Sequence, residues 1–247
     1  MSDGLSTSFG RAAGDYERGR PDYPTDAVAW MLEPAQEAGR AVRVADVGAG
    51  TGKLTRVLVD LGADAVAVDP DPDMLTALHR ALPTVPTFPG SGERLPLPDG
   101  AVDAVVFGQA WHWVDPAEAS VEVARVLRPG GILGLVWNIR DESVPWVRRL
   151  TAIMHGSHAE ELLAGEGPVV APPLGALEER TWTWSRPVDR ATLTAMVRSR
   201  SYIITAPAEE RARIETEAAA LFDEVGAVGD ALVELPYRTR AFRSVRP

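Results

Sequence analysis

The chain has 247 residues, of which 45% are hydrophobic and 24% charged, a composition typical of one large folded domain. It contains no cysteine, which excludes a disulfide framework, a thiolate metal cluster and a cysteine nucleophile. The net charge is -10, with 16 basic against 27 acidic residues in 1–189 and 9 against 8 in 190–247. An acidic body repels the phosphate backbone, so we expect no nucleic-acid partner.

The chain also carries no sign of export or membrane insertion. Its first residues lack the basic and apolar regions of a secretory signal peptide. No stretch approaches 18 uninterrupted apolar residues. We therefore expect a cytoplasmic protein with no membrane partner.

Short β-branched runs alternate with amphipathic stretches between Val42 and Asp141, a pattern typical of βαβ units and a parallel sheet. Turn-forming residues separate these runs. The predicted strands cover 42–47, 65–69, 85–88, 102–107 and 132–137. The predicted helices between them cover about 53–61, 70–82 and 115–127.

Beyond Asp141 the pattern changes to longer helical segments. Helices are expected over about 144–158, 190–199 and 207–225, and a further strand at 180–184. The last strand is expected over 232–245, broken by Pro236 because proline has no amide hydrogen to donate. No linker is polar enough to separate two independent domains.

A glycine-rich loop, Asp46-Val-Gly48-Ala-Gly50-Thr-Gly52, follows the first strand. Its alternating glycines allow a ligand to approach the main chain closely. Asp69 ends the second strand, where an acid accepts hydrogen bonds from ribose hydroxyls. The combination predicts a nucleotide-type site.

The residues of this loop exclude two common classes of nucleotide ligand. It is not a P-loop, because Lys53 is followed by Leu54 instead of a hydroxyl residue. The glycine spacing differs from the dinucleotide fingerprint, and Asp46 would repel a pyrophosphate. Such an anion suits a ligand that carries an amine and a sulfonium.

Four sequence blocks in one order resemble the class I S-adenosylmethionine-dependent methyltransferases over about Val44 to Val136. They are the glycine loop, Asp69-Pro70, the stretch 90–103, and Leu127-Arg-Pro-Gly-Gly131. Two further stretches, 16–24 and the Gln-Ala-Trp-His-Trp run at 109–113, are similar to the trans-aconitate-methyltransferase-like subgroup. The second of these follows the fourth strand.

The resemblance implies a cofactor site for S-adenosyl-L-methionine. The methionine end would contact Asp46, Gly48, Gly50 and Gln109, and the ribose hydroxyls would contact Asp69. The adenine would lie against Pro70 or Met74, with Gly92 at its edge. Ser91 stands where many relatives have Asp, which weakens an adenine contact there. Tyr16, Arg20 and Tyr23 would form a lid segment, with Arg20 a partner for the carboxylate of the cofactor.

Each cofactor residue also has a purely structural interpretation. Gly48 and Gly50 could form only a tight turn, and Asp69-Pro70 could simply cap the following helix. Asp46 could pair with Arg43 or Arg56, which would leave cofactor binding to the glycines. The resemblance favours the cofactor interpretation for all of them.

The acceptor site is expected at the carboxyl edge of the sheet, where open α/β folds bind ligands. His112 could act as a general base, position the acceptor or be a packed hydrogen-bonding group. The tryptophans beside it could line a pocket or pack in the core. Arg198 and Arg200 could clamp an acidic acceptor or be solvated. The predicted substrate-binding residues are Trp111, Trp113, Trp137, Arg200 and Tyr202.

The expected fold is α/β, a doubly wound Rossmann-like, seven-stranded, mostly parallel sheet with an antiparallel last strand and a helical cover over the cleft. We expect one structural domain, organised as an N-terminal lid and first helix (1–40), a cofactor-binding core (41–142), helical insertions with one strand (143–230) and a final strand (231–247). No spacing of histidines with carboxylates suggests a metal site.

The expected function is methyl transfer from S-adenosylmethionine to a small-molecule substrate by in-line displacement, which needs mainly proximity and orientation. The product would be S-adenosyl-L-homocysteine. Two alternatives stay open, an NAD(P)-dependent oxidoreductase and a non-catalytic S-adenosylmethionine-binding protein. The protein is expected to be a monomer or homodimer.

Overall fold

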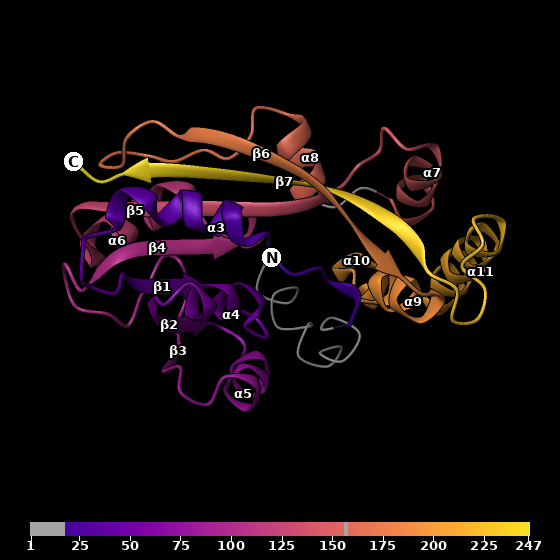
Figure 1. The fold of residues 1–247 in the computed structure, drawn as a ribbon, viewed down its shortest axis with the longest axis horizontal. Coiled ribbons are helices and arrows are strands. Elements are labelled where there is room, and N and C mark those ends of the chain that lie inside the picture. The colour runs from indigo at the N-terminus through magenta and orange to yellow at the C-terminus, as the bar shows by residue number, and fades with distance from the viewer. Residues whose placement is uncertain (1–17, 156–157) are drawn as a thin grey trace.

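A computed structural model describes residues 18–155 and 158–247, which form a seven-stranded sheet with helices on both faces (Figure 1). The strands lie in the order β3-β2-β1-β4-β5-β7-β6. Their bounds are Arg43–Val47 (β1), Asp64–Asp69 (β2), Thr87–Pro89 (β3), Val102–Gly108 (β4), Leu127–Arg140 (β5), Glu178–Val188 (β6) and Val233–Val245 (β7).

The first five strands are parallel, and β7 is antiparallel to both of its neighbours. The central strands carry near-continuous runs of buried apolar residues because helices cover both faces of the sheet. The strand order reverses between β1 and β4, which lie side by side. The predicted mostly parallel sheet with an antiparallel last strand is confirmed.

The helices are distributed over both faces of the sheet and one of its ends. One face packs against α3 and α4 around buried Met31 and Leu58, and the other against α6 and α8 around Val123 and Leu163. The helix bounds are Thr25–Leu32 (α3), Lys53–Asp60 (α4), Pro72–Ala81 (α5), Pro116–Val126 (α6), Pro145–Met154 (α7), His158–Ala164 (α8), Arg190–Arg198 (α9), Ser201–Thr205 (α10) and Ala208–Glu224 (α11). Short 3₁₀ turns span Glu33–Ala35 (η2) and Trp111–Trp113 (η3).

The helices α7, α9, α10 and α11 form a separate group beyond the carboxyl ends of the parallel strands (Figure 1). They pack on one another around a buried cluster that includes Leu150, Leu193, Ile214 and Leu221. The strands β6 and β7 extend from the sheet into this group. This arrangement places helices from residues 143–230 next to the edge where the parallel strands end.

The final strand differs from its prediction, because β7 runs through Pro236 without a break. The carbonyl of Pro236 accepts from the amide of Asp141, on the side where β5 has ended, since the last β5 pairing joins Arg140 to Tyr237. In a strand, the N–H and C=O of one residue point to the same side. The missing N–H of Pro236 therefore faces Asp141 on the β5 side, and the pairing of β7 with β6 continues through Pro236.

Three other elements also differ from their predicted bounds. The predicted strand at 85–88 lies at Thr87–Pro89, and the predicted strand at 180–184 extends over Glu178–Val188. The predicted helix over 144–158 ends at Met154, because His155 takes a positive φ of 58°, and α8 follows. Among the described residues, no helix combines the length and apolar character that crossing a membrane requires.

Candidate functional site

The glycine loop connects β1 to α4 at the carboxyl edge of the sheet. The amides of Gly48 and Ala49 donate to the carbonyl of Val68 at 2.8 and 3.1 Å, which holds the loop against the end of β2. Gly48 has a φ of 68°, and a Cβ there would lie 2.5 Å from the Cβ of Ala110. No side chain fits at position 48, so the loop and the segment after β4 can meet in contact.

Asp46 lies at the end of β1 and is 0% exposed. Its Oδ2 accepts a hydrogen bond from the Thr55 hydroxyl at 2.6 Å, whereas its Oδ1 accepts none from the described residues. Burial raises the pKa of Asp46 to about 7, with the charge of Asp69 adding to the rise and Thr55 opposing it. A buried carboxylate oxygen without a hydrogen-bond partner favours a ligand group that donates a hydrogen bond or carries a positive charge.

Asp69 ends β2 beside the same loop. Its Oδ2 accepts from the amide of Gly50 and its Oδ1 from the amide of Asp71, both at 2.8 Å. Burial raises the pKa of Asp69, and these two amide hydrogen bonds oppose the rise. The carboxylate therefore fixes the loop to the start of α5, and each oxygen keeps acceptor capacity for a ligand hydroxyl.

A pocket lies between the glycine loop and the N-terminal segment 18–24. Asp46, Gly48 and Thr51 line it from the loop, and Arg20, Tyr23 and Gln109 line it from other segments. Gln109 follows β4 with a φ of 53°, and its amide donates to the carbonyl of Val136 at 2.8 Å. A non-glycine residue in this conformation is uncommon and concentrates at functional sites.

Hydrogen bonds from three elements hold the segment 18–24 in place. Lys53 forms an ion pair with Asp22 at 3.1 Å, and the Asn138 amide donates to the carbonyl of Asp22. The guanidinium of Arg186 in β6 donates to main-chain carbonyls in residues 18–20. The segment thereby spans from the glycine loop to the helical group. Tyr16, which was predicted to act with it, lies outside the described residues.

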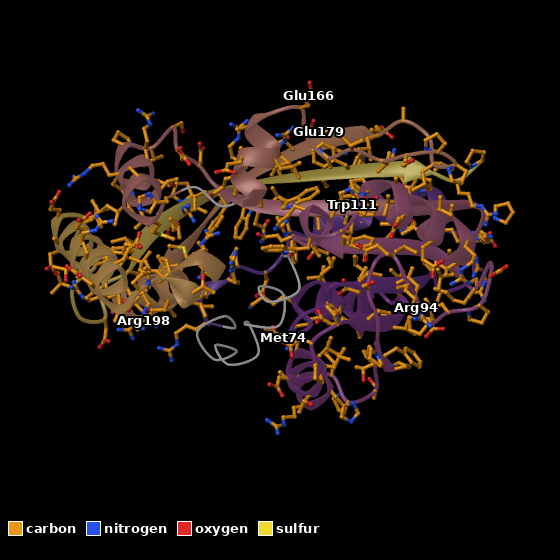
Figure 2. The ribbon with its side chains drawn as sticks, turned by 180° about the vertical axis from the view of Figure 1, so that it is seen from behind. Met74, Arg94, Trp111, Glu166, Glu179 and Arg198 are labelled. Carbon is orange, nitrogen blue, oxygen red and sulfur yellow. The ribbon has the colours of Figure 1, made fainter. Side chains whose placement is uncertain are left out.

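The residues expected near an adenine lie around the ends of β2 and β3. Pro70 is exposed at the surface, and Met74 is buried on α5, where Figure 2 labels it. Ser91 pairs with Arg94 in a tight turn. Gly92 packs against Phe107 and Val114.

The two tryptophans nearest the fourth and fifth strands are core residues. Trp111 is 2% exposed, packs edge-on against Phe107 at 4.9 Å between ring centroids and donates to the carbonyl of Val169 (Figure 2). Trp137 is 0% exposed and packs edge-on against Phe242. Both contribute to the core beneath α6 and α8, and Trp113 is the partly exposed tryptophan of this run.

The hydrogen bond from Trp137 indicates which ring nitrogen of His112 carries the hydrogen. The indole Nε1 donates to His112 Nδ1 at 3.3 Å. An indole nitrogen can only donate, so Nδ1 carries no hydrogen and the neutral ring carries its hydrogen on Nε2. In this state Nε2 donates a hydrogen bond and accepts no proton. The geometry therefore favours a positioning role for His112 over a general base.

The two arginines predicted to clamp an acidic acceptor have different surroundings in the structure. Arg198 lies on the helical group, where it forms an ion pair with Glu215 at 2.8 Å (Figure 2). Arg200 is buried at the start of α10, and its Nε–H donates to no acceptor among the described residues. The side chain of Tyr202 lies outside the described part of the structure.

The sequence interpretation missed several residues of the site. Thr55, which binds Asp46, comes two residues after Lys53 in α4, and no local pattern distinguishes it from other helical threonines. Asn138 and Arg186 come from β5 and β6 and reach the N-terminal segment only through folding. Among residues 18–155 and 158–247, no group of His, Asp and Glu side chains is arranged to hold a metal ion.

The sequence of this chain is similar to those of methyltransferases. Residues 45–135 match the model of the methyltransferase domain family. An uncharacterized methyltransferase of Mycobacterium tuberculosis is 49% identical over 209 residues, which are 85% of this chain and 83% of that protein. The chain belongs to the methyltransferase family.

Solved structures of other methyltransferases share the fold of this chain. A structure from Anaeromyxobacter dehalogenans, described as a type II methyltransferase, matches with a TM-score of 0.67 at 21% identity. The match covers 91% of this chain and 97% of that chain. An S-adenosylmethionine-dependent methyltransferase of Thermotoga maritima has a TM-score of 0.50 at 15% identity, covering 97% and 99%. The two likenesses concern the arrangement of strands and helices.

Proposed function

We propose that the methyltransferase uses S-adenosylmethionine and transfers its methyl group to a small-molecule acceptor. One observation carries the proposal: the buried Asp46 has an oxygen without a described partner, and it lies across the glycine loop from Asp69. Asp46 supplies a negative charge for an ammonium, and Asp69 supplies acceptors for ribose hydroxyls. The guanidinium of Arg20, in the same pocket, would hold the carboxylate of the methionine end.

When bound, S-adenosylmethionine supplies an electrophilic methyl group on a sulfonium, and the bond to sulfur breaks with its electron pair left on a neutral thioether. The residues of this chain then have three tasks, which are to bind, to orient and to exclude water. The segment 18–24 and Gln109 border the pocket and would restrict access of water to it. The Nε2–H of His112 would orient an acceptor through one hydrogen bond.

Calorimetry with S-adenosylhomocysteine tests the cofactor. We expect saturable binding at micromolar concentration and no binding of NADH under the same conditions. Binding of NADH without binding of S-adenosylhomocysteine would refute the proposal in favour of an oxidoreductase. A matched variant, Glu37→Gln, changes an exposed carboxylate at the opposite edge of the sheet and should bind like the wild type.

Turnover distinguishes an enzyme from a sensor. Incubation of the protein with S-adenosylmethionine carrying a deuterated methyl group and a metabolite extract should produce S-adenosylhomocysteine and a deuterium-labelled product. A protein that only senses the cofactor would bind it and form neither. The mass of the labelled product would also identify the acceptor.

A further inference from the structure

An excess of positive charge lies beyond the cofactor pocket, where β5 ends. Arg140, the last residue of β5, is 4% exposed. Its Nε and Nη2 donate to the hydroxyl of Thr151 at 3.3 and 3.1 Å, and Nη2 also forms an ion pair with Glu160 at 2.8 Å. Its Nη1 is buried and has no acceptor among the described residues. Part of this guanidinium thus lacks the partner that a buried charge requires.

A second guanidinium reaches the same place from β6. The two Nη atoms of Arg186 donate to main-chain carbonyls in residues 18–20, and its Nε is buried without a described acceptor. Carbonyl oxygens are neutral, and no carboxylate within residues 18–155 and 158–247 is seen to form an ion pair with Arg186. Both arginines therefore keep one buried N–H donor without an acceptor among the described residues, although Glu160 already balances the charge of Arg140.

Strand register places these groups in one cluster around Tyr237, because Arg140 of β5 pairs with Tyr237 and Arg186 of β6 pairs with Leu235, two residues before it on the same face of β7. Burial raises the pKa of Tyr237, and the positive charges of Arg186, Arg140 and Arg20 oppose that rise. Three guanidinium groups thus lie within electrostatic range of one buried hydroxyl. Glu160, which already pairs with Arg140, is the carboxylate that acts on the same hydroxyl.

The cluster is continuous with the cofactor pocket. Arg20 lines that pocket, and its carbonyl accepts from Arg186. Asn138, two residues before Arg140, donates to the carbonyl of Asp22 in the same segment. A molecule bound at Arg140 and Arg186 would therefore lie next to the cofactor. The carboxylate of one cofactor molecule could contact Arg20, and it would leave the unsatisfied donors of Arg140 and Arg186 for a second anion.

We propose that Arg140 and Arg186 hold an oxyanion group, a carboxylate or a phosphate, of the methyl acceptor. The inference rests on the proposed methyltransferase function and adds the chemical class of its substrate. Guanidinium groups fit both oxyanions because they donate two parallel hydrogen bonds. The unsatisfied Nη1 of Arg140 and Nε of Arg186 are the donors available for it.

Fractionation of a metabolite extract tests the substrate class. An extract of the cells that naturally express the protein is separated on an anion-exchange resin at pH 7, and each fraction is assayed with deuterium-labelled S-adenosylmethionine. The retained, anionic fraction should support methyl transfer. Methyl transfer confined to the unretained fraction would overturn the inference and leave the methyltransferase function intact. The retained acceptor's mass and phosphorus content distinguish a carboxylate from a phosphate.

Variants test the two arginines. Arg140→Lys keeps the positive charge that pairs with Glu160 but removes the second nitrogen, Nη1, which would donate to the acceptor. Loss of a charged hydrogen bond should raise the KM for the active fraction by about 10- to 100-fold. The affinity for S-adenosylhomocysteine should stay within about twofold, since Arg140 lies outside the cofactor pocket. An unchanged KM would refute the role of Arg140, and Arg186→Lys provides the same test if Arg140→Lys does not fold.

A direct binding measurement separates this inference from the proposed function. Calorimetry with citrate and with inorganic phosphate, each added to the protein saturated with S-adenosylhomocysteine, should detect one of them. The binding should weaken in Arg140→Lys and persist in Arg149→Gln, a variant of an exposed arginine of α7 that pairs with Glu224. If neither anion binds, the inference fails even where turnover is found. If anions bind but no fraction is methylated, the proposed function fails and the anion site stands.

Discussion

At the scale of single residues, Asp46 is the group whose environment departs most from that of a surface carboxylate. Burial raises its pKa to about 7 from an ordinary value of 3.8. The folded state therefore holds a proton between these two values that the unfolded state has released. This group contributes its full share of stability below about pH 3.8 and loses it progressively as the pH rises toward 7. A cationic ligand would recover this loss by pairing with the ionised form.

Affinity for S-adenosylhomocysteine should consequently rise with pH. Between pH 6 and pH 8 the ionised fraction of a carboxyl with a pKa about 7 increases about tenfold, and the affinity should follow it. Calorimetry at several pH values measures this change. Asp46→Asn should bind more weakly and without this dependence. An affinity of the wild type that does not change over this range would exclude a charge pairing by Asp46.

Asp69 provides a second test, which concerns hydrogen bonds. Asp69→Ala removes the acceptors expected for the ribose hydroxyls and the anchors of Gly50 and Asp71. The affinity for S-adenosylhomocysteine should fall by roughly 1–3 kcal/mol. Calorimetry reports this loss, and Asp73→Ala, on the exposed side of the α5 start, is the control. Equal affinities of the Asp69 variant and the wild type would remove the ribose role.

His112 should act as a hydrogen-bond donor. Its Nδ1 accepts from the indole of Trp137, which leaves the ring hydrogen on Nε2 as the donor. His112→Gln, which keeps a donor at a similar distance, should retain more activity than His112→Ala, where we expect about a tenfold loss. Steady-state kinetics of the two variants measure this difference, and equal losses in both would contradict the donor role.

At the scale of elements, an ion-pair network holds the amino end of β4, opposite the cofactor edge. Asp103 is 0% exposed and forms ion pairs with Arg40 at 2.6 Å and Arg128 at 2.8 Å. It also accepts from the amide of Arg43 at 2.8 Å. The network joins the segment before β1, the start of β4 and the start of β5, so one carboxylate fixes three segments.

Asp103→Ala should therefore destabilise the fold and leave the cofactor site intact. We expect a loss of about 2–4 kcal/mol in the free energy of unfolding, near the lower part of the range for buried pairs because both arginines reach solvent. Urea unfolding measures it. Glu37→Ala, which removes a half-exposed partner of the same arginines, should cost less than about 1 kcal/mol. Equal losses would contradict the importance of burial.

At the scale of the whole molecule, the segment 18–24 links the Rossmann-like core to the helical group. Gly19 lies against the backbone of α9, and a Cβ there would come within 2.5 Å of the Cα and N atoms of Met196. On its other side, Asp22 pairs with Lys53 next to the glycine loop. The position of the helical group is thus coupled to the pocket through one short segment.

Gly19→Val should displace this segment, because its side chain cannot fit against the main chain of Met196. Arg20 and Tyr23 would leave the pocket, and the affinity for S-adenosylhomocysteine should fall by about tenfold or more, which corresponds to the loss of one charged hydrogen bond. Calorimetry measures the affinity. Gly165→Ala, whose added Cβ meets only ordinary contacts, should bind normally. Wild-type affinity in Gly19→Val would show that the segment is not required.

The sequence alone determined the parallel core of the sheet, the glycine loop and the position of Asp69. These features depend on residue period and turn chemistry, which are local and can be recognised in a single chain. Its predictions failed at Pro236, because the effect of a missing N–H depends on which neighbour lies opposite. The helix predicted over 144–158 was likewise too long, since the positive φ of His155 ends it.

Only the tertiary structure decided which side chains meet. It placed Trp111 and Trp137 in the core, and it paired Asp46 with Thr55. It also gathered Arg20, Arg140 and Arg186 from the N-terminal segment, β5 and β6 around one buried hydroxyl. Partners so far apart in the chain leave no local pattern, because their contact arises from strand order and helix packing. The arginine cluster that we propose to bind the acceptor is therefore a property of the folded molecule.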